Sequence, residues 1–150
     1  MTIGELLLSE FDKEMANTRK ILECVPEGKF DWRPHGKSST LGRLANHLAA
    51  LPTLAAVVIY GQAKRMPEAS SKVDLLAALD SNVATGRKAL AGVSENDLAA
   101  MMPPVGMTRA EALRERVMNH LIHHRGQLSV YLRLLDVPAP GMYGPSADEK

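Results

Sequence analysis

The sequence is organised around one stretch, Asn119-His120-Leu121-Ile122-His123-His124-Arg125-Gly126-Gln127, which holds three of the chain's five histidines. Apolar residues on both sides of this stretch recur at steps of three and four, as they do on one face of an α-helix, and two of the histidines fall into the same series. The series is Leu113, Val117, His120, His124, Leu128, Tyr131 and Leu135. With a capping box at Thr108 and Glu111, it predicts a helix that runs through Leu135 and buries two imidazoles.

The spacing of these two imidazoles indicates a metal site. His120 and His124 are four residues apart, so their rings point the same way from neighbouring turns and can bind one ion. Burying an imidazole costs free energy unless both of its nitrogens have partners. His123 falls outside the apolar series, so we expect it to flank the site. Leu121 stands where a HExxH metalloprotease has its glutamate, which excludes that class.

A third ligand is expected from a helix that begins at Ser39 or Thr40, either of which can cap it. Pro52 should kink this helix. Its apolar series includes one histidine: Leu41, Leu44, His47, Leu48, Leu51, Ala55 and Val58. We therefore expect the three histidines of the two series to converge on one divalent metal, and these are His47, His120 and His124.

Three imidazoles with one open position form the ligand set of a catalytic zinc site. Imidazole also suits nickel, iron(II) and copper, so the ligands leave the metal open. The sequence also allows a bundle without metal, in which the three histidines only form hydrogen bonds. No Gly-x-Ser-x-Gly elbow and no glycine-rich phosphate loop occur in the sequence.

Two further helices complete the expected set. The first begins at Thr2, which has capping-box spacing with Glu5, and runs to about Val25. The other runs from Ser71 to Leu90, and Gly86 should weaken it by about 1 kcal/mol relative to alanine. The inward positions of the helix from Ser71 to Leu90 are expected to be Leu75, Leu76, Leu79, Val83, Arg87 and Leu90.

Four amphipathic helices predict an all-α fold, a four-helix bundle in one domain over residues 1–150. We expect irregular structure at 27–39, a short helical turn at 94–98, a loop at 101–106 and a Pro/Gly-rich tail at 136–150, with no strand. The long connections leave the order and direction of the helices open.

Several other residues near the expected site have two interpretations. Glu10 and Glu14 flank the apolar face of the first helix and are expected on the surface, although either could act as a base near the metal. Arg125 is expected to be solvated, although it and Gln127 could reach the mouth of a pocket. Two asparagines are candidates for hydrogen bonds beside the metal ligands: Asn46 and Asn119.

Three residues of the first helix and the following connection are expected to be structural. Cys24 is expected to be a partly buried thiol, Trp32 to pack its loop onto the bundle, and His35 to be a solvated loop residue.

The composition sets limits on partners and compartment. With 45% hydrophobic and 23% charged residues and a net charge of +1, the chain resembles an ordinary soluble protein and predicts neither nucleic acid nor an anionic membrane as partner. A single cysteine excludes an internal disulfide and suits the cytoplasm. We find no signal peptide, and the apolar run Leu48 to Tyr60 is shorter than the roughly 20 residues of a spanning helix.

The chain resembles the DinB-like (DinB/YfiT) superfamily over nearly its whole length. The residues that carry the resemblance are Thr18 to Leu22, Asp31 to His35, Thr40 to His47, Asn119 to Gln127, Val137-Pro138 and Tyr143 to Ser146. The resemblance implies an antiparallel four-helix bundle, commonly a homodimer, with a nickel or zinc ion on three histidines. The histidine triad of the family falls on His47, His120 and His124.

The resemblance also implies a function. Characterised relatives include S-transferases that use a low-molecular-weight thiol, bacillithiol or mycothiol, and a mycothiol-dependent isomerase. We therefore expect a cytoplasmic metal-dependent enzyme, of transferase or hydrolase type, that acts on a small molecule. The alternative is a non-catalytic, stress-associated dimer whose metal supports a surface rather than a reaction.

Overall fold

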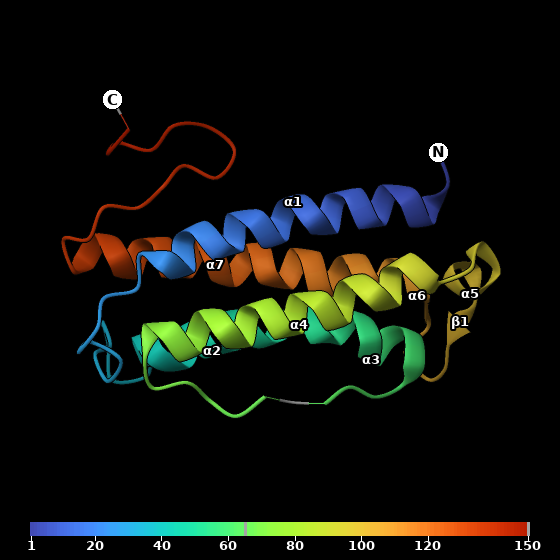
Figure 1. Cartoon of the computed structure of the whole chain (residues 1–150), viewed down its shortest axis with the longest axis horizontal. Helices are drawn as coiled ribbons and strands as arrows, with labels where there is room; N and C mark the ends of the chain where they lie inside the picture. The colour runs from blue at the N-terminus through green and yellow to red at the C-terminus, as the bar shows by residue number, and fades with distance from the viewer. Residues whose placement is uncertain (65, 150) are drawn as a thin grey trace.

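The structure is a computed structural model that describes residues 1–64 and 66–149, and the regular secondary structure within them is helical apart from one short hairpin. The long helical segments are α1 (Ile3–Glu23), α2 (Leu41–Ala50) continued by α3 (Leu54–Tyr60), α4 (Lys72–Gly92), and α6 (Arg109–Leu113) continued by α7 (His120–Leu134). They form a four-helix bundle in which α1 and α6–α7 run in one direction and α2–α3 and α4 run in the other (Figure 1). The all-α prediction is confirmed.

The direction of the helices follows from one long connection. Residues 61–64 and 66–71 lie along the bundle between the end of α3 and the start of α4, so two successive helical segments run the same way (Figure 1). As a result α1 packs antiparallel to α4, and α2 packs antiparallel to α7.

The helices begin where the sequence predicts. Thr2 and Glu5 form a complete capping box at α1, and Thr108 and Glu111 form another at α6. The Thr40 side chain accepts a hydrogen bond from the Arg43 amide at the start of α2, as expected of an N-cap. The other N-caps are Ser71 of α4 and Ser94 of the short helix α5 (Glu95–Ala99).

Pro52 interrupts the helical segment formed by α2 and α3, where a kink was predicted, and α4 packs against this kink. Residues Leu51–Thr53 form a single 3-10 turn, η1, between α2 and α3. On α4, the buried Asn82 donates from Nδ2 to the carbonyl of Ala49 at 2.8 Å. A β-carbon on Gly86 would lie 2.3 Å from the carbonyl oxygen of Pro52. Gly86 therefore lets the backbone of α4 approach the kink.

This close approach changes the predicted inward face of α4. The face is built on small or amide side chains at Ala78, Asn82, Gly86 and Ala89, together with Leu75, Leu79 and Leu90. Arg87 is exposed and forms an ion pair with Asp12 of α1 at 2.9 Å, so its placement in the inward series is wrong. Val83 is only half-buried. The predicted series contained large side chains, whereas the tight packing of α4 against the kink requires small side chains on its buried face.

A two-stranded hairpin replaces part of the loop predicted at 101–106. Strand β1 (Met101–Met102) pairs antiparallel with β2 (Met107–Thr108). It closes the end of the bundle beside α5 and leads into α6 (Figure 1). The prediction of no strand is therefore wrong here, because a pairing of two residues a side is too short to produce a period-two pattern.

The apolar segment Leu41–Tyr60 is a core element. Its 20 residues have a mean hydropathy of 1.3, which by length and composition would suffice to cross a membrane. However, 56% of its apolar window is buried inside the fold. It also contains Asn46, His47 and the Pro52 kink. The sequence analysis counted only the apolar run from Leu48 to Tyr60, whereas the helical segment begins at Leu41 and is therefore longer.

A buried ion pair joins α1 to α7, and here two expectations are wrong. Arg125 is 2% exposed and Glu14 is 8% exposed, although both were expected at the surface. Arg125 Nη2 donates to Glu14 Oε2 at 2.5 Å, and Nη1 donates to the Glu14 carbonyl and to the Thr18 hydroxyl. The arginine is buried because several acceptors of α1 satisfy its guanidinium.

The C-terminal tail completes this cluster. The Tyr143 hydroxyl donates to Glu14 Oε2 at 2.7 Å and accepts from Arg125 Nη2 at 2.5 Å. The tail folds back past the ends of α1 and α7 (Figure 1), where Asp148 pairs with Arg133 at 2.6 Å. Burial, together with the hydrogen bond to Glu14, raises the pKa of the Tyr143 hydroxyl, so it stays protonated as a donor. The segment that the sequence marked only as non-helical is thus an ordered part of the structure.

Replacing Gly86 with alanine should destabilise the protein. The added methyl group would meet the Pro52 carbonyl and the Phe11 ring, the latter at 2.9 Å, and overpacking of this kind costs about 1–3 kcal/mol. Gly126→Ala is the matched control, since it also lies within a helix but has no atom within 4 Å of the added carbon. This control should gain about 0.5–1 kcal/mol. Urea denaturation of both variants measures the difference, and equal stability changes would contradict the close packing.

Glu14→Gln should destabilise the protein by about 3–5 kcal/mol, because it leaves the buried Arg125 charge uncompensated. A double variant, Glu14→Leu with Arg125→Met, should recover much of this loss because it removes both buried charges. Urea denaturation at neutral pH measures both effects.

The exposed pair of Glu10 and Arg114, at 2.7 Å, provides the control between the same two helical segments. Glu10→Gln should change the free energy of unfolding by less than about 1 kcal/mol. If the Glu14 and Glu10 variants lost similar stability, the buried pair would not carry the role assigned to it.

Candidate metal centre

A π-helical segment precedes the two histidines of α7 and sets their orientation. Residues Arg114–Asn119, η2, form this wider turn between α6 and α7. The buried positions that follow it are Leu121, Arg125, Leu128 and Leu132. His120 and His124 lie one position before two of these residues, so they are half-buried at the edge of the inward face. They were expected to be buried, whereas the structure leaves them half-buried at this edge, which faces α2.

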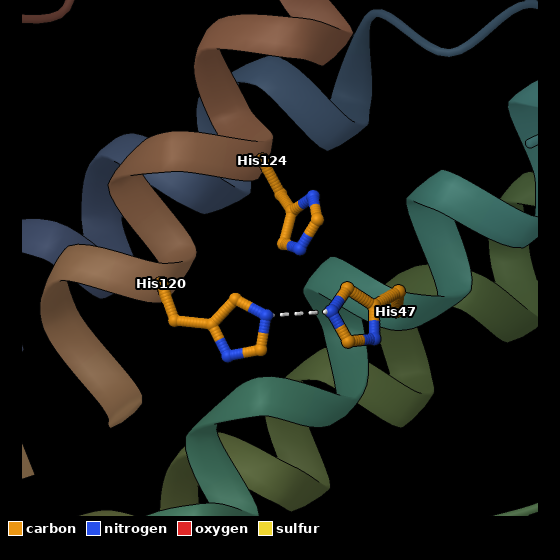
Figure 2. A group of neighbouring side chains, drawn as sticks. All are labelled: His47, His120 and His124. Atoms are coloured by element: carbon orange, nitrogen blue, oxygen red, sulfur yellow. Dashed lines mark hydrogen bonds between the residues drawn. The ribbon is translucent and has the colours of Figure 1, made fainter. Parts of the chain in front are cut away.

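Three imidazoles converge at this edge. His47 of α2 points toward His120 and His124 of α7, and the three rings surround a common point (Figure 2). One ring nitrogen from each lies within 4.8 Å of the other two. The Nε2 atoms of His47 and His120 are 3.1 Å apart. The ring centroids are 4.5–5.0 Å apart. The structure therefore brings together the three histidines singled out from the sequence.

Hydrogen bonds fix the rings of the two α7 histidines. His124 Nδ1 donates to Gln127 Oε1 at 2.7 Å, which turns Nε2 toward the other rings (Figure 2). The His120 ring is hydrogen-bonded to the backbone of Arg116. In the π-helical turn, the backbone amide of His120 donates to Glu115 and Val117, so the Arg116 carbonyl is available to the imidazole.

The environment favours the neutral form of His120. Its pKa is lowered mainly by burial, then by the neighbouring positive charge of His124 and, less, of His123, against the opposing effect of the Arg116 hydrogen bond. The neutral imidazole is the form that binds a metal ion. Both the position of His120 in the triad and the lowering of its pKa therefore favour metal binding by this residue.

The remaining histidines and the cysteine lie outside this group. His123 is exposed, with its ring centroid 4.9 Å from that of His124, as expected of a flanking residue. His35 is an exposed loop residue whose Nδ1 accepts from the Lys37 amide. Cys24 is partly buried and burial raises the pKa of its thiol. Among the described residues, only the triad gathers enough ligand atoms for an ion.

A pocket of about 530 Å³ opens beside the triad, and His47 and His124 form part of its wall. Its interior wall includes Leu44, Ala49, Ala50, Ala78 and Asn82, and its rim includes Lys37, Arg43, Glu68, Gln127 and Tyr131. Residues 66–68 of the connection between α3 and α4 form its outer wall, and Asn46 forms two hydrogen bonds with the backbone of the following residue, Ala69, at 2.7 and 2.8 Å.

Two expectations about the polar neighbours change as a result. Asn46 orders the pocket wall instead of a histidine ring, and Asn119 is an exposed residue at the end of the π-helical segment. Gln127, which the sequence allowed to reach the mouth of a pocket, both lines the pocket and orients His124. Its position three residues after His124, within reach on the same helix face, is the signal that could have indicated this.

Comparison with known proteins agrees with the helical fold. The family model described as the DinB family matches residues 1–150. The comparison with curated proteins finds no match. A solved structure of a DinB-like protein from Bacillus cereus has a TM-score of 0.76 at 24% identity, over 93% of this chain and 97% of that one. Another from Bacillus subtilis has a TM-score of 0.74 at 20% identity, over 91% and 97%.

At these identities the two solved structures support the fold alone. The family model, in contrast, extends over the whole chain. The chain belongs to the DinB family.

Proposed function

We propose that this protein is a metal-dependent enzyme in which His47, His120 and His124 bind one divalent ion at the wall of a substrate pocket. The observation that carries the proposal is the convergence of three ring nitrogens, within 4.8 Å of one another, beside a pocket of about 530 Å³. Metal ligands that serve only stability are usually closed off from solvent, whereas catalytic ligands leave one position open.

The residues fit such an ion. Metal–nitrogen bonds of about 2.0–2.1 Å at tetrahedral angles place two ligating nitrogens about 3.3 Å apart. The two Nε2 atoms of His47 and His120 are 3.1 Å apart, close to this value. Gln127 and the Arg116 carbonyl already hold the α7 rings in ligating orientations, which is the usual role of groups behind metal-bound histidines.

A bound divalent ion would lower the pKa of a thiol or water in its open position. The chain itself supplies the orientation of the ligands and a pocket large enough for a small electrophile. The proposed reaction class is attack of a thiolate, or of hydroxide, on an electrophilic carbon, with cleavage of the bond to a leaving group that departs with the bonding electron pair. The thiol in this proposal comes from the resemblance to thiol-dependent S-transferases, and nickel or zinc is the proposed metal.

The alternative function, a non-catalytic metal-binding dimer, receives less support. It requires a metal without access to a substrate, whereas two of the three histidines line the pocket. A third possibility is a bundle in which the histidines only form hydrogen bonds. The distance of 3.1 Å between the Nε2 atoms of His47 and His120 is also that of a hydrogen bond. Homodimer formation, a cytoplasmic location and a single domain remain predictions.

The triad is tested by metal analysis. His47→Ala and His120→Ala should lose bound metal, because two imidazoles hold an ion far less tightly than three, while wild-type protein should hold close to one ion per chain. His123→Ala and His35→Ala are matched controls that should keep it. Elemental analysis gives the stoichiometry, and retention of full metal in both triad variants would refute the site.

A chelator tests whether the ion is part of the folded protein. Because a ligand that binds only the native state stabilises it, removal of the ion should lower the melting temperature of the wild type. The His120→Ala variant should not respond. An unchanged melting temperature of the wild type would favour the metal-free alternative.

Gln127→Ala should weaken metal binding by about 10- to 100-fold, because His124 loses the acceptor that fixes its ring. Gln127→Glu should restore affinity, since a carboxylate also accepts the hydrogen bond from Nδ1. Asn119→Ala is the control, because this exposed residue precedes His120 without lining the pocket. Competition with a chromogenic chelator measures the affinities, and equal values for all variants would contradict the role of Gln127.

A further inference from the structure

One buried polar side chain lines the deep wall of the pocket. Asn82 of α4 is 3% exposed, and it is one of four polar or charged residues that are buried within the described part of the chain. The other three, Glu14, Thr18 and Arg125, belong to the cluster between α1 and α7 and lie outside the pocket lining. Asn82 is therefore the buried polar group that a ligand in the pocket would meet.

The amide of Asn82 has a fixed orientation. Its Nδ2 donates to the Ala49 carbonyl at 2.8 Å, and a carbonyl oxygen can only accept, so Oδ1 must be turned away from Ala49. Within residues 1–64 and 66–149, Oδ1 forms no hydrogen bond. Nor is it closed off from solvent, since in these ranges the enclosed side-chain atom without a partner is Nε of Arg109. The rest of the Asn82 side chain is buried, so its free acceptor opens onto the pocket that it lines.

Tight packing keeps this acceptor in place. Asn82 lies one turn after Ala78 and one turn before Gly86, on the face of α4 that meets the kink at Pro52. A side chain held by a hydrogen bond and by close neighbours has little conformational entropy left to lose when a ligand binds. The acceptor is therefore preorganised for binding.

The wall around this acceptor is apolar. It consists of the side chains of Leu44, Ala49, Ala50 and Ala78. A ligand that fills this space excludes water from Asn82 Oδ1. If the ligand placed an alkyl group there, the amide oxygen would lose its hydrogen bond to water and gain none, which is unfavourable. A hydroxyl or N–H group of the ligand would restore the hydrogen bond.

The acceptor and the histidine triad share the pocket. Ala49, to which Asn82 is bonded, follows the proposed metal ligand His47 by two residues on α2, about 3 Å along the helix axis. His47 and Asn82 both line the pocket. A small molecule can therefore have its reacting carbon beside the triad and a hydrogen-bond donor at Asn82. A bound divalent ion would repel a cationic donor, which favours a neutral hydroxyl or amide.

We propose that Asn82 is a specificity-determining residue, whose Oδ1 selects a small electrophile with a neutral hydroxyl or amide N–H donor at the end away from the metal. This inference rests on the proposed function, since it places the reacting carbon at the triad. A pocket with a buried acceptor discriminates against a ligand that lacks the matching donor, because the acceptor is then left unpaired. Asn82 thus binds substrate in addition to supporting the kink.

The test uses the full-length protein loaded with cobalt(II) and three hydroxamates, which bind metal ions through their two oxygen atoms. Their tails have equal numbers of non-hydrogen atoms. The tail of 5-hydroxypentanohydroxamate ends in a donor, that of 4-methoxybutanohydroxamate has an ether oxygen that only accepts, and that of hexanohydroxamate has neither. The visible absorption of cobalt(II) measures the affinities. We expect the alcohol to bind about five- to tenfold more tightly than the ether.

The variants connect this ratio of affinities to Asn82. Asn82→Leu should lower the ratio about five- to tenfold and leave hexanohydroxamate binding intact, which shows that the pocket and the metal are retained. Asn46→Ala is the matched control, because this asparagine lines the same pocket but its Oδ1 already accepts from the Ala69 amide, so the ratio should not change.

Two results would overturn the inference and leave the proposed function intact. One is a ratio that stays the same in Asn82→Leu. The other is an equal loss of affinity for all three hydroxamates in this variant, because a purely structural role of Asn82 would affect the three ligands alike.

A second measurement depends neither on bound metal nor on a folded variant. In the wild-type protein as purified, the ¹³C chemical shift of Asn82 Cγ should move downfield during titration with acetamide, whose N–H groups can donate to Oδ1. Acetone has a similar shape without a donor and should have a much smaller effect. If no hydroxamate bound to the cobalt(II) protein, the proposed function would fail, and this titration would still test Asn82. Equal responses to acetamide and acetone would overturn the inference.

Discussion

The structure depends on one buried charge, that of Arg125. A guanidinium inside a helical bundle is stable only if its acceptors are fixed, and here they come from Glu14 and Thr18 of α1 and from Tyr143 of the tail. The register of α7 against α1 cannot slip by a turn without separating these groups. Because successive helical residues differ by about 100° in direction, fixing Arg125 toward α1 also fixes His124 toward α2.

The candidate site therefore obtains its geometry from the core. His47 is held beside the Pro52 kink, into which Asn82 and Gly86 of α4 pack. His124 is oriented by the ion pair on one side and by Gln127 on the other. The rings thus lie on helices whose positions are fixed by packing and hydrogen bonds outside the site, which is the arrangement that a metal site needs.

The sequence was sufficient where the signal is local. Capping residues, the Pro52 kink and the i, i+4 histidines each depend on neighbours along the chain, so the helices and the triad could be predicted. The partner of Arg125 is 111 residues away, and no local pattern shows that Glu14 faces it. Likewise, Gly86 looked like a weak point in a helix until the Pro52 carbonyl was found against it. The triad was predicted correctly although His120, His124 and Tyr131 of the apolar series lie one position before the buried residues of α7.

That offset arises in the π-helical segment at 114–119. A π-helical turn is equivalent to one extra residue accommodated within an α-helix, and each residue accounts for about 100° of rotation. A relative with a regular α-helix here would therefore align with this chain through a single-residue gap between α6 and α7. An alignment that closes this gap would match each histidine to a neighbouring position. Motif searches in such relatives should count spacings from His120 onward rather than from the start of the helix.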